Sequence, residues 1–149
     1  MFAWDNSQTD GRPADFLLQL LSSQASDSKV AVRKGAVSLL TSFLLILRAA
    51  RADKALQDSA MRRSTTVLKT LARDSSHTVR KATIDAAAFL AGEAPTDQEV
   101  VTAWAHVVFP MMHDAELSVQ EAVQAEVCMS SRFGSRCSAT HPGVCRLLR

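Results

Sequence analysis

At 149 residues, with 47% hydrophobic residues, no Tyr, five Gly and four Pro, the chain fits a single α-helical domain with a core of Leu, Val and Ala and is unlike an all-β fold. The net charge of +2 conceals two opposite regions, because residues 29–81 hold twelve basic and three acidic residues, whereas residues 82–127 hold eight acidic residues and no Lys or Arg. Gly-rich phosphate loops and a GxSxG turn are missing, which argues against the nucleotide-binding and hydrolase folds that use them.

The first predicted hairpin covers residues 13–50, with helices over residues 13–21 and 28–50. Residues 1–12 have neither a basic segment nor an apolar run, so we expect a flexible N-terminus without a secretory signal. The second helix contains the longest apolar stretch, residues 36–47, whose 12 residues fall short of the roughly 20 that span a bilayer. We therefore expect a buried core helix and no membrane contact.

Two further hairpins are predicted, over residues 52–92 and 96–127. Their helices are expected over residues 59–73, 76–91, 98–113 and from residue 118 onward. Gly92 is the expected C-cap of the fourth helix. Gln124 and Glu126 stand where the earlier repeats carry apolar residues, so we expect the third hairpin to be ragged.

Residues 128–149 show no periodicity, and we expect a disordered tail there. All three Cys lie in this tail, whereas a secreted disulfide framework would spread them through the fold, so a reducing, intracellular compartment is favoured. Cys137, His141 and Cys145 are spaced by four residues, and Cys128 could complete a set of four ligands, but zinc ligands more often come as tight CxxC pairs. We expect neither a metal site nor a cofactor.

One motif recurs three times and is the main indication of the fold. It is written DSKVAVRK from Asp27, DSSHTVRK from Asp74 and DAELSVQE from Asp114, at offsets of 47 and 40 residues. Such a period is typical of HEAT or armadillo hairpins, which stack because one unit cannot bury its own apolar face. The sequence thus predicts an α-solenoid of about three HEAT-type hairpins, either complete as a short stack or part of a longer one. The structural motif residues are Asp27, Val32, Arg33, Asp74, Val79, Arg80, Asp114 and Val119.

The motif residues are expected to stabilise the turn of each hairpin and the start of its second helix. Asp27 is expected to pair with Arg33 across the turn of its own hairpin, and Asp74 with Arg80 in the same way. A Ser, Thr or Asp just ahead of the Val is expected to cap the second helix of each hairpin. Because a catalytic residue has no reason to recur in every repeat, we expect these residues to be structural.

A basic band in the first two repeats is the candidate functional site. Equivalent positions in a solenoid align along one edge, so these side chains could form a continuous stripe that neutralises DNA phosphates. An ordinary solvated surface with local ion pairs is the alternative, and neither a base-reading motif nor interleaved aromatic residues decide between the two. The candidate DNA-binding residues are Lys29, Arg33, Lys34, Arg62, Arg63, Lys69, Arg73, Arg80 and Lys81.

Three segments resemble the HEAT array of the large D-three subunit of condensin II. They are DSKVAVRKGAVSLL from Asp27, the segment from Asp58 to Leu90, and WAHVVFPMMHDAELSVQE from Trp104, and the resemblance covers roughly residues 15–123. It implies a scaffold without catalysis of its own, which joins a kleisin subunit and paired SMC ATPases and contacts DNA or chromatin on mitotic chromosomes in the nucleus. Residues 124–149 depart from the family pattern.

Two other classes of function remain as alternatives. A general HEAT adaptor, such as a transport receptor or a tubulin-binding array, is one, although Trp4 and Trp104 are not followed by Asn as in cargo receptors. The other is a HEAT-type DNA-repair enzyme, which needs a carboxylate and aromatic residues around a pocket. None of the four His is followed by Glu, unlike HEAT-repeat metal enzymes with His-Glu iron ligands. We expect no enzyme activity and no small-molecule substrate.

Overall fold

The computed structural model describes the backbone of residues 12–137 and the side chains of residues 13–128. Over this part of the chain every regular element is a helix, and no β-strand occurs. The helices are α1 (Arg12–Gln24), α2 (Val30–Ala49), α3 (Lys54–Leu71), α4 (His77–Glu93), α5 (Gln98–Val108), the 3₁₀ helix η2 (Phe109–His113) and α6 (Leu117–Cys137). The predicted all-α fold is confirmed.

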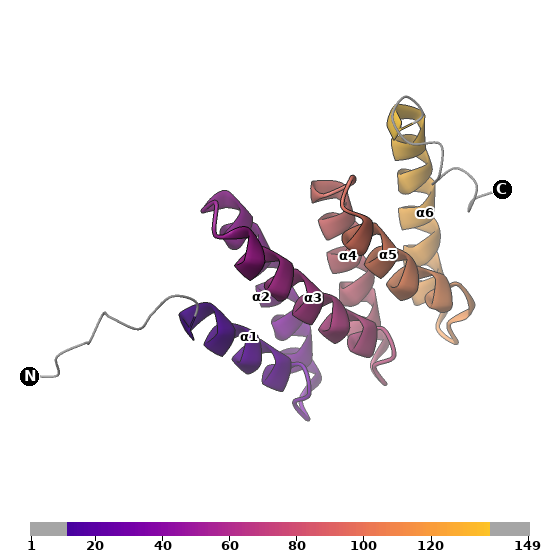
Figure 1. The fold of residues 1–149 in the computed structure, drawn as a ribbon. Coiled ribbons are helices and arrows are strands. Elements are labelled where there is room, and N and C mark those ends of the chain that lie inside the picture. Colours follow the sequence, from indigo (N-terminus) through magenta and orange to yellow (C-terminus); the bar gives the residue numbers. More distant parts are fainter. Residues whose placement is uncertain (1–11, 138–149) are drawn as a thin grey trace, which may run out of the picture.

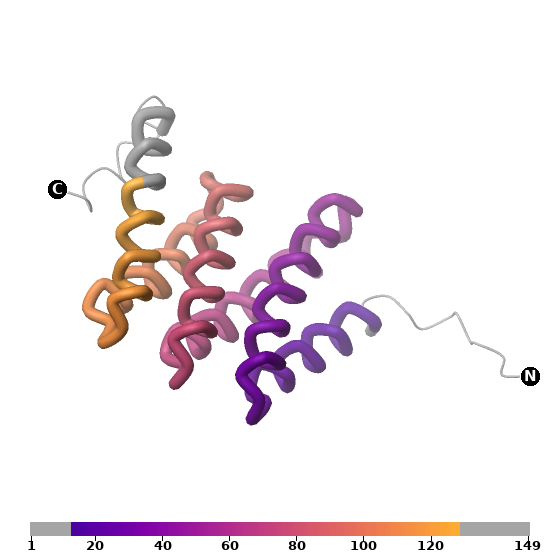
Figure 2. The backbone as a smooth tube through the Cα atoms, turned by 180° about the vertical axis from the view of Figure 1, so that it is seen from behind, coloured from indigo at the N-terminus to yellow at the C-terminus, as the bar shows by residue number. Residues whose placement is uncertain are grey.

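The helices form three stacked hairpins in two layers. The layer of α1, α3 and α5 faces the viewer in Figure 1, and the layer of α2, α4 and α6 faces the viewer in Figure 2. The turns that join α1 to α2, α3 to α4 and η2 to α6 all lie along one edge of the stack, which we call the turn edge. The molecule is therefore the predicted α-solenoid, with α1 and α2 at one end and α6 at the other.

The core lies between the two layers and is built from Leu, Val, Ile and Ala. Helix α4 is central, because it packs against α2, α3, α5 and α6. Its small residues Ala86 and Ala87 are buried together with Ile84 and Leu90, and small side chains allow helices to approach closely. Helix α2 turns a buried stripe toward its neighbours, formed by Ala36, Val37, Leu40, Leu44 and Leu47.

By length and composition α2 could also cross a membrane, since it has 20 residues and a mean hydropathy of 1.7. The helix is longer than the apolar stretch of residues 36–47, because it also includes residues 30–35 before that stretch and residues 48–49 after it. In the structure α2 packs against α1, α3 and α4, which gives it the place of a core helix in the solenoid. Two of its large apolar residues, Leu39 and Ile46, nevertheless remain exposed.

Three predicted boundaries are wrong for local reasons. Helix α3 begins at Lys54 rather than at residue 59. The α-helical part of the fifth helix ends at Val108, because Pro110 has no amide hydrogen to continue it, and a 3₁₀ turn follows to His113. Gly92 is an ordinary helical residue within α4 and not its C-cap.

The expected disordered tail from residue 128 is also wrong in its first part. Helix α6 continues to Cys137, since it contains no proline, and fading amphipathicity does not break backbone hydrogen bonds. Residues 138–149, with His141 and Cys145, and residues 1–11 lie outside the described part of the chain. The expectations of a tail and of a flexible N-terminus therefore stay predictions there.

Candidate functional site

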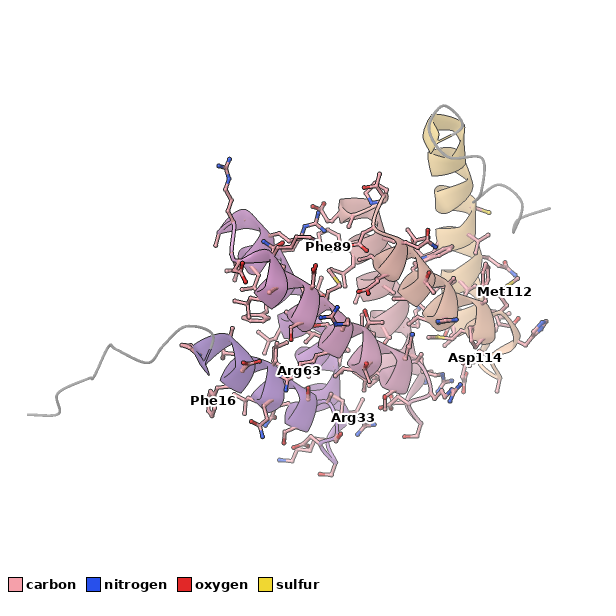
Figure 3. All side chains as sticks on the ribbon, in the orientation of Figure 1. Phe16, Arg33, Arg63, Phe89, Met112 and Asp114 are labelled. Carbon is pink, nitrogen blue, oxygen red and sulfur yellow. The ribbon has the colours of Figure 1, made fainter. Side chains whose placement is uncertain are left out.

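An ion-pair ladder runs along the turn edge and joins each hairpin to the next. The Arg33 guanidinium donates to both carboxylate oxygens of Asp74, with Nε 2.6 Å from Oδ2 and Nη2 2.8 Å from Oδ1. Arg80 makes the same two bonds to Asp114, both at 2.7 Å. Such two-pronged bonds between Arg and a carboxylate are among the stronger hydrogen bonds in proteins. Figure 3 shows Arg33 and Asp114 along this edge.

Each arginine of the ladder also closes the turn of its own hairpin. Arg33 Nη1 donates to the carbonyl oxygen of Asp27 at 2.8 Å and to that of the next residue at 3.1 Å. Arg80 Nη1 donates to the carbonyl oxygen of Asp74 at 2.7 Å and to that of the next residue at 3.2 Å. One guanidinium thus fixes a turn and holds the following hairpin.

The predicted partners of these residues need two corrections. The carboxylate that pairs with each Arg belongs to the next hairpin, whereas the Asp of the same hairpin contributes only its carbonyl oxygen. The N-caps of α2 and α4, Lys29 and Ser76, make no side-chain capping bond. Instead, Asp74 Oδ1 accepts the Ser76 amide at 2.8 Å, so the aspartate itself organises the start of the helix.

Both ion pairs are shielded from water, and this affects their titration. The side chains of Arg33 and Asp74 are 12% and 7% exposed, and those of Arg80 and Asp114 are 13% and 9% exposed. The hydrogen bonds from Arg33 lower the pKa of Asp74, and those from Arg80 lower the pKa of Asp114, in each case against an opposing effect of burial. The same bonds raise the pKa values of the two arginines.

The ladder ends at Gln120, which occupies the place of Arg33 and Arg80 in the third hairpin. Its Nε2 donates to the Asp114 carbonyl at 2.6 Å, so the amide keeps the turn-closing bond of the arginine. It has no charge to offer to a further carboxylate. The sequence already contained this signal, because DAELSVQE lacks the Arg of the other two motifs.

The structure divides the nine candidate DNA-binding residues. Arg33 and Arg80 are engaged in the ladder and are not available to phosphates. Arg63 pairs with Asp15 of α1 at 2.8 Å, a contact between neighbouring hairpins that we did not predict. The other six form no ion pair within the described residues, and they are Lys29, Lys34, Arg62, Lys69, Arg73 and Lys81.

These six residues, which we call the basic surface, follow the geometry of the first two hairpins. Arg62, Lys69 and Arg73 are seven and four residues apart, so they lie along one side of α3 and its C-terminal end. Lys34 and Lys81 occupy equivalent positions at the starts of α2 and α4, at the same turn edge. The third hairpin has Glu121 at this position, and the basic surface ends there.

A shallow groove adjoins the basic surface between α3 and α5. It has a volume of about 390 Å³ and is lined by Arg62, Lys69, Glu99 and four neutral polar residues, Thr65, Thr66, Gln98 and Thr102. A second hollow, of about 250 Å³, lies between the ends of α2 and α3 and the loop after α4, and it is lined by charges of both signs. Neither of these two hollows is lined by an aromatic side chain.

The described residues contain no group of three or more His, Cys, Asp or Glu arranged to hold a metal ion. Cys128 is exposed near the end of the described side chains. Glu126 on α6 is the one other titratable group of note among them, since burial, and secondarily the charge of Asp85 on α4, raise the pKa of its carboxyl. A single carboxyl beside a like charge is not a catalytic constellation.

Comparisons of this chain with protein-family models, with curated proteins and with solved structures found no match.

Proposed function

We propose that this chain is a non-catalytic HEAT-type scaffold that binds DNA through phosphate contacts on its basic surface. The observation that carries the proposal is the division of its cations. Two arginines hold the hairpins together, while six basic residues on α3 and the turn edge have no acidic partner within the described residues. Cations without acidic partners on a rigid support suit contacts with phosphates.

The proposed setting is mitotic chromosome condensation, as a subunit similar to the D-three subunit of condensin II. The support is the resemblance of three segments over roughly residues 15–123, together with an α-solenoid fold of the kind that such a scaffold requires. The proposed partners are a kleisin subunit, the paired SMC ATPases and DNA or chromatin, and the proposed location is the nucleus.

A general HEAT adaptor for other proteins is the second candidate, because stacked hairpins also suit protein docking. A DNA-repair enzyme has less support, since the two hollows described above lack aromatic residues. The acidic third hairpin would repel phosphates, so under the DNA proposal it stays away from the DNA.

Fluorescence anisotropy with two unrelated DNA duplexes at several salt concentrations tests the proposal. We expect weak binding that is indifferent to sequence and falls steeply with salt, because counterion release drives it. Lys69→Glu should weaken binding and reduce the slope of log K against log salt by about 0.9 for each phosphate that the variant no longer neutralises. Glu99→Lys, in the groove beside Lys69, should strengthen it.

The matched control is Lys54→Glu on the same helix. Lys54 is also exposed, but it lies at the other end of α3 and pairs with Asp58 at 3.3 Å. Its reversal changes the net charge as much as Lys69→Glu and should leave the salt slope unchanged. Equal effects of the two reversals would show general attraction rather than a surface, and no binding at low salt would leave protein docking as the function.

A further inference from the structure

The two ends of the stack differ, and the difference begins at Asp27. Its Oδ1 accepts the Lys29 amide at 2.7 Å, as Asp74 does from Ser76 at 2.8 Å, so the carboxylate is oriented like those of the ladder. Asp74 and Asp114 each receive an Arg from the preceding hairpin, whereas no basic side chain among the described residues pairs with Asp27. The first rung of the ladder thus has an acceptor and no donor.

The burial of the motif valines also distinguishes this end of the stack from the rest. Val79 and Val119 are fully buried, and a preceding second helix packs beside each of them, α2 beside α4 and α4 beside α6. Val32, the equivalent residue of the first hairpin, is only half-buried. The first hairpin therefore lacks the cover that the other two receive.

Large apolar side chains are also exposed on the two helices of this first hairpin. Leu39 and Ile46 of α2 are 60% and 63% exposed, and each follows a buried residue, Val37 or Leu44, by two positions. Two positions turn an α-helix by about 200°, which places the exposed pair on the side opposite the buried pair. The same turn separates Leu17 of α1 from Asp15, the residue that contacts α3.

These residues define an end face that turns away from the rest of the stack. Leu20, one helical turn beyond Leu17, and Phe16 are exposed in the same region, and Figure 3 shows Phe16 at the free end of the stack. Together they make an apolar surface bordered by the carboxylate of Asp27. We call this surface the open face, and its residues are Phe16, Leu17, Leu20, Asp27, Val32, Leu39 and Ile46.

The opposite end of the stack lacks the arginine and the aliphatic residue that the first two hairpins carry, and we call it the closed end. The buried Val37 and Ile84, four residues after the ladder arginines, correspond to Gln124 in α6, which is exposed. Gln120 replaces the arginine itself. At these two positions the third hairpin is therefore polar and without a guanidinium, unlike the first two hairpins.

We infer that the open face binds a helical hairpin from outside this sequence, one that carries an Arg followed four residues later by Val, Ile or Leu at the start of its second helix. This is the donor pattern of Arg33 with Val37 and of Arg80 with Ile84, and it would place a guanidinium on Asp27 and an aliphatic side chain on the apolar surface. The fit repeats a contact that the chain makes twice within itself.

Charge and hydrogen bonding argue against three other occupants, which are a second copy of the chain, its N-terminal residues and a lipid surface. A second copy stacked head to tail would present Gln120 and Gln124, and a second copy face to face would oppose Asp27 to Asp27. Residues 1–11 contain no Lys or Arg and therefore cannot supply a guanidinium to the first rung. A lipid surface would not require an oriented carboxylate at the border of the open face.

The test uses the whole chain as both acceptor and donor. The double variant Gln120→Arg, Gln124→Val places the donor pattern on the closed end, and we expect it to associate head to tail in sedimentation velocity while the wild-type chain stays monomeric. Adding Asp27→Asn to the double variant should weaken this association roughly tenfold, the effect of one charged hydrogen-bonded pair. The double variant Gln120→Lys, Gln124→Val is the matched control and should associate more weakly, because Lys cannot bond both carboxylate oxygens in a fork.

A photo-cross-linker at Leu39 of the wild-type chain, used in a nuclear extract, identifies the natural occupant. We expect a cross-linked helix with the Arg and aliphatic pattern, and its loss with Asp27→Asn. Cross-links to either terminal segment of the same chain, to a second copy, to lipid or to a helix without the Arg would each overturn the inference. Self-association of the double variant that Asp27→Asn leaves unchanged would also overturn the inference. The same holds if the double variant does not self-associate and the wild-type chain gives no cross-link.

Discussion

At the scale of single residues, the ladder depends on the shape of the arginine side chain. Arg80 uses Nε and Nη2 for Asp114 and Nη1 for two carbonyl oxygens, so its planar fork serves four acceptors in two directions. Lysine has one nitrogen and cannot occupy both places. A rung of the ladder therefore requires Arg at this position, even though Lys follows it directly in both VRK sequences.

We predict that Arg80→Lys lowers the free energy of unfolding by about 1–3 kcal/mol, the range for removing a charged hydrogen bond from a shielded site. Lys81→Arg is the neighbouring control, because Lys81 has no ion pair within the described residues, and it should change stability by less than about 0.5 kcal/mol. Urea unfolding at pH 7 measures both variants. Equal effects of the two substitutions would contradict a specific role for the fork.

The ladder also predicts a dependence on pH. Folding lowers the pKa values of Asp74 and Asp114, so their contribution to stability is complete above the ordinary carboxyl pKa and is lost as the pH falls through the lowered values. The difference in stability between the wild-type chain and Asp114→Asn should therefore be constant near neutral pH and shrink below about pH 4. A difference as large at pH 2 as at neutral pH would mean that Asp114 stabilises the fold other than by its charge.

At the scale of helices, α3 contains a polar group in an unfavourable place. Ser64 is fully buried, and its hydroxyl has no hydrogen-bond partner, whereas the buried Thr83 of α4 donates to the Val79 carbonyl at 2.9 Å. We predict that Ser64→Ala stabilises the protein by about 1 kcal/mol, because it removes an unsatisfied hydroxyl and introduces the best helix former. Thr83→Val, the control with a satisfied hydroxyl, should not stabilise it, as thermal melts of both would show.

The helices also show what sequence patterns can predict. Repeated motifs and apolar stripes were sufficient for three hairpins and for most boundaries within a few residues. The end of α5 depended on Pro110, and the length of α6 on hydrogen bonds that do not require an amphipathic pattern. Periodicity reports burial rather than helix formation, so it missed the continuation to Cys137.

The candidate site was less predictable, because its register depends on stacking. The motif showed that Asp and Arg recur together, but the offset between hairpins decides that Arg33 meets Asp74 rather than Asp27. For the same reason Arg33 and Arg80, two of the nine residues predicted to bind DNA, hold the hairpins together instead. Asp15 gave no sequence signal at all, since it pairs with Arg63, a residue 48 positions away in the chain.

At the scale of the whole molecule, the chain is polarised along its stack. Its first end exposes apolar residues and an oriented carboxylate, its first two hairpins expose cations, and its last hairpin is acidic. A solenoid keeps these regions apart because each hairpin contacts only its neighbours. Its stability then depends on the middle hairpin, whose helix α4 contacts α2 on one side and α5 and α6 on the other.

We therefore predict that one charge in the centre of α4 unfolds the whole array. Ala87 is 4% exposed, and an unpaired carboxylate there would cost several kcal/mol, against a total stability of about 5–15 kcal/mol. Neither outer hairpin can bury its apolar face alone. Circular dichroism should thus show helicity lost in one step for Ala87→Asp and for Leu40→Asp, but unchanged for Gln124→Asp at an exposed position of α6. A variant of Ala87 that kept part of its helicity and melted in a second transition would show that a single hairpin is stable without its neighbours.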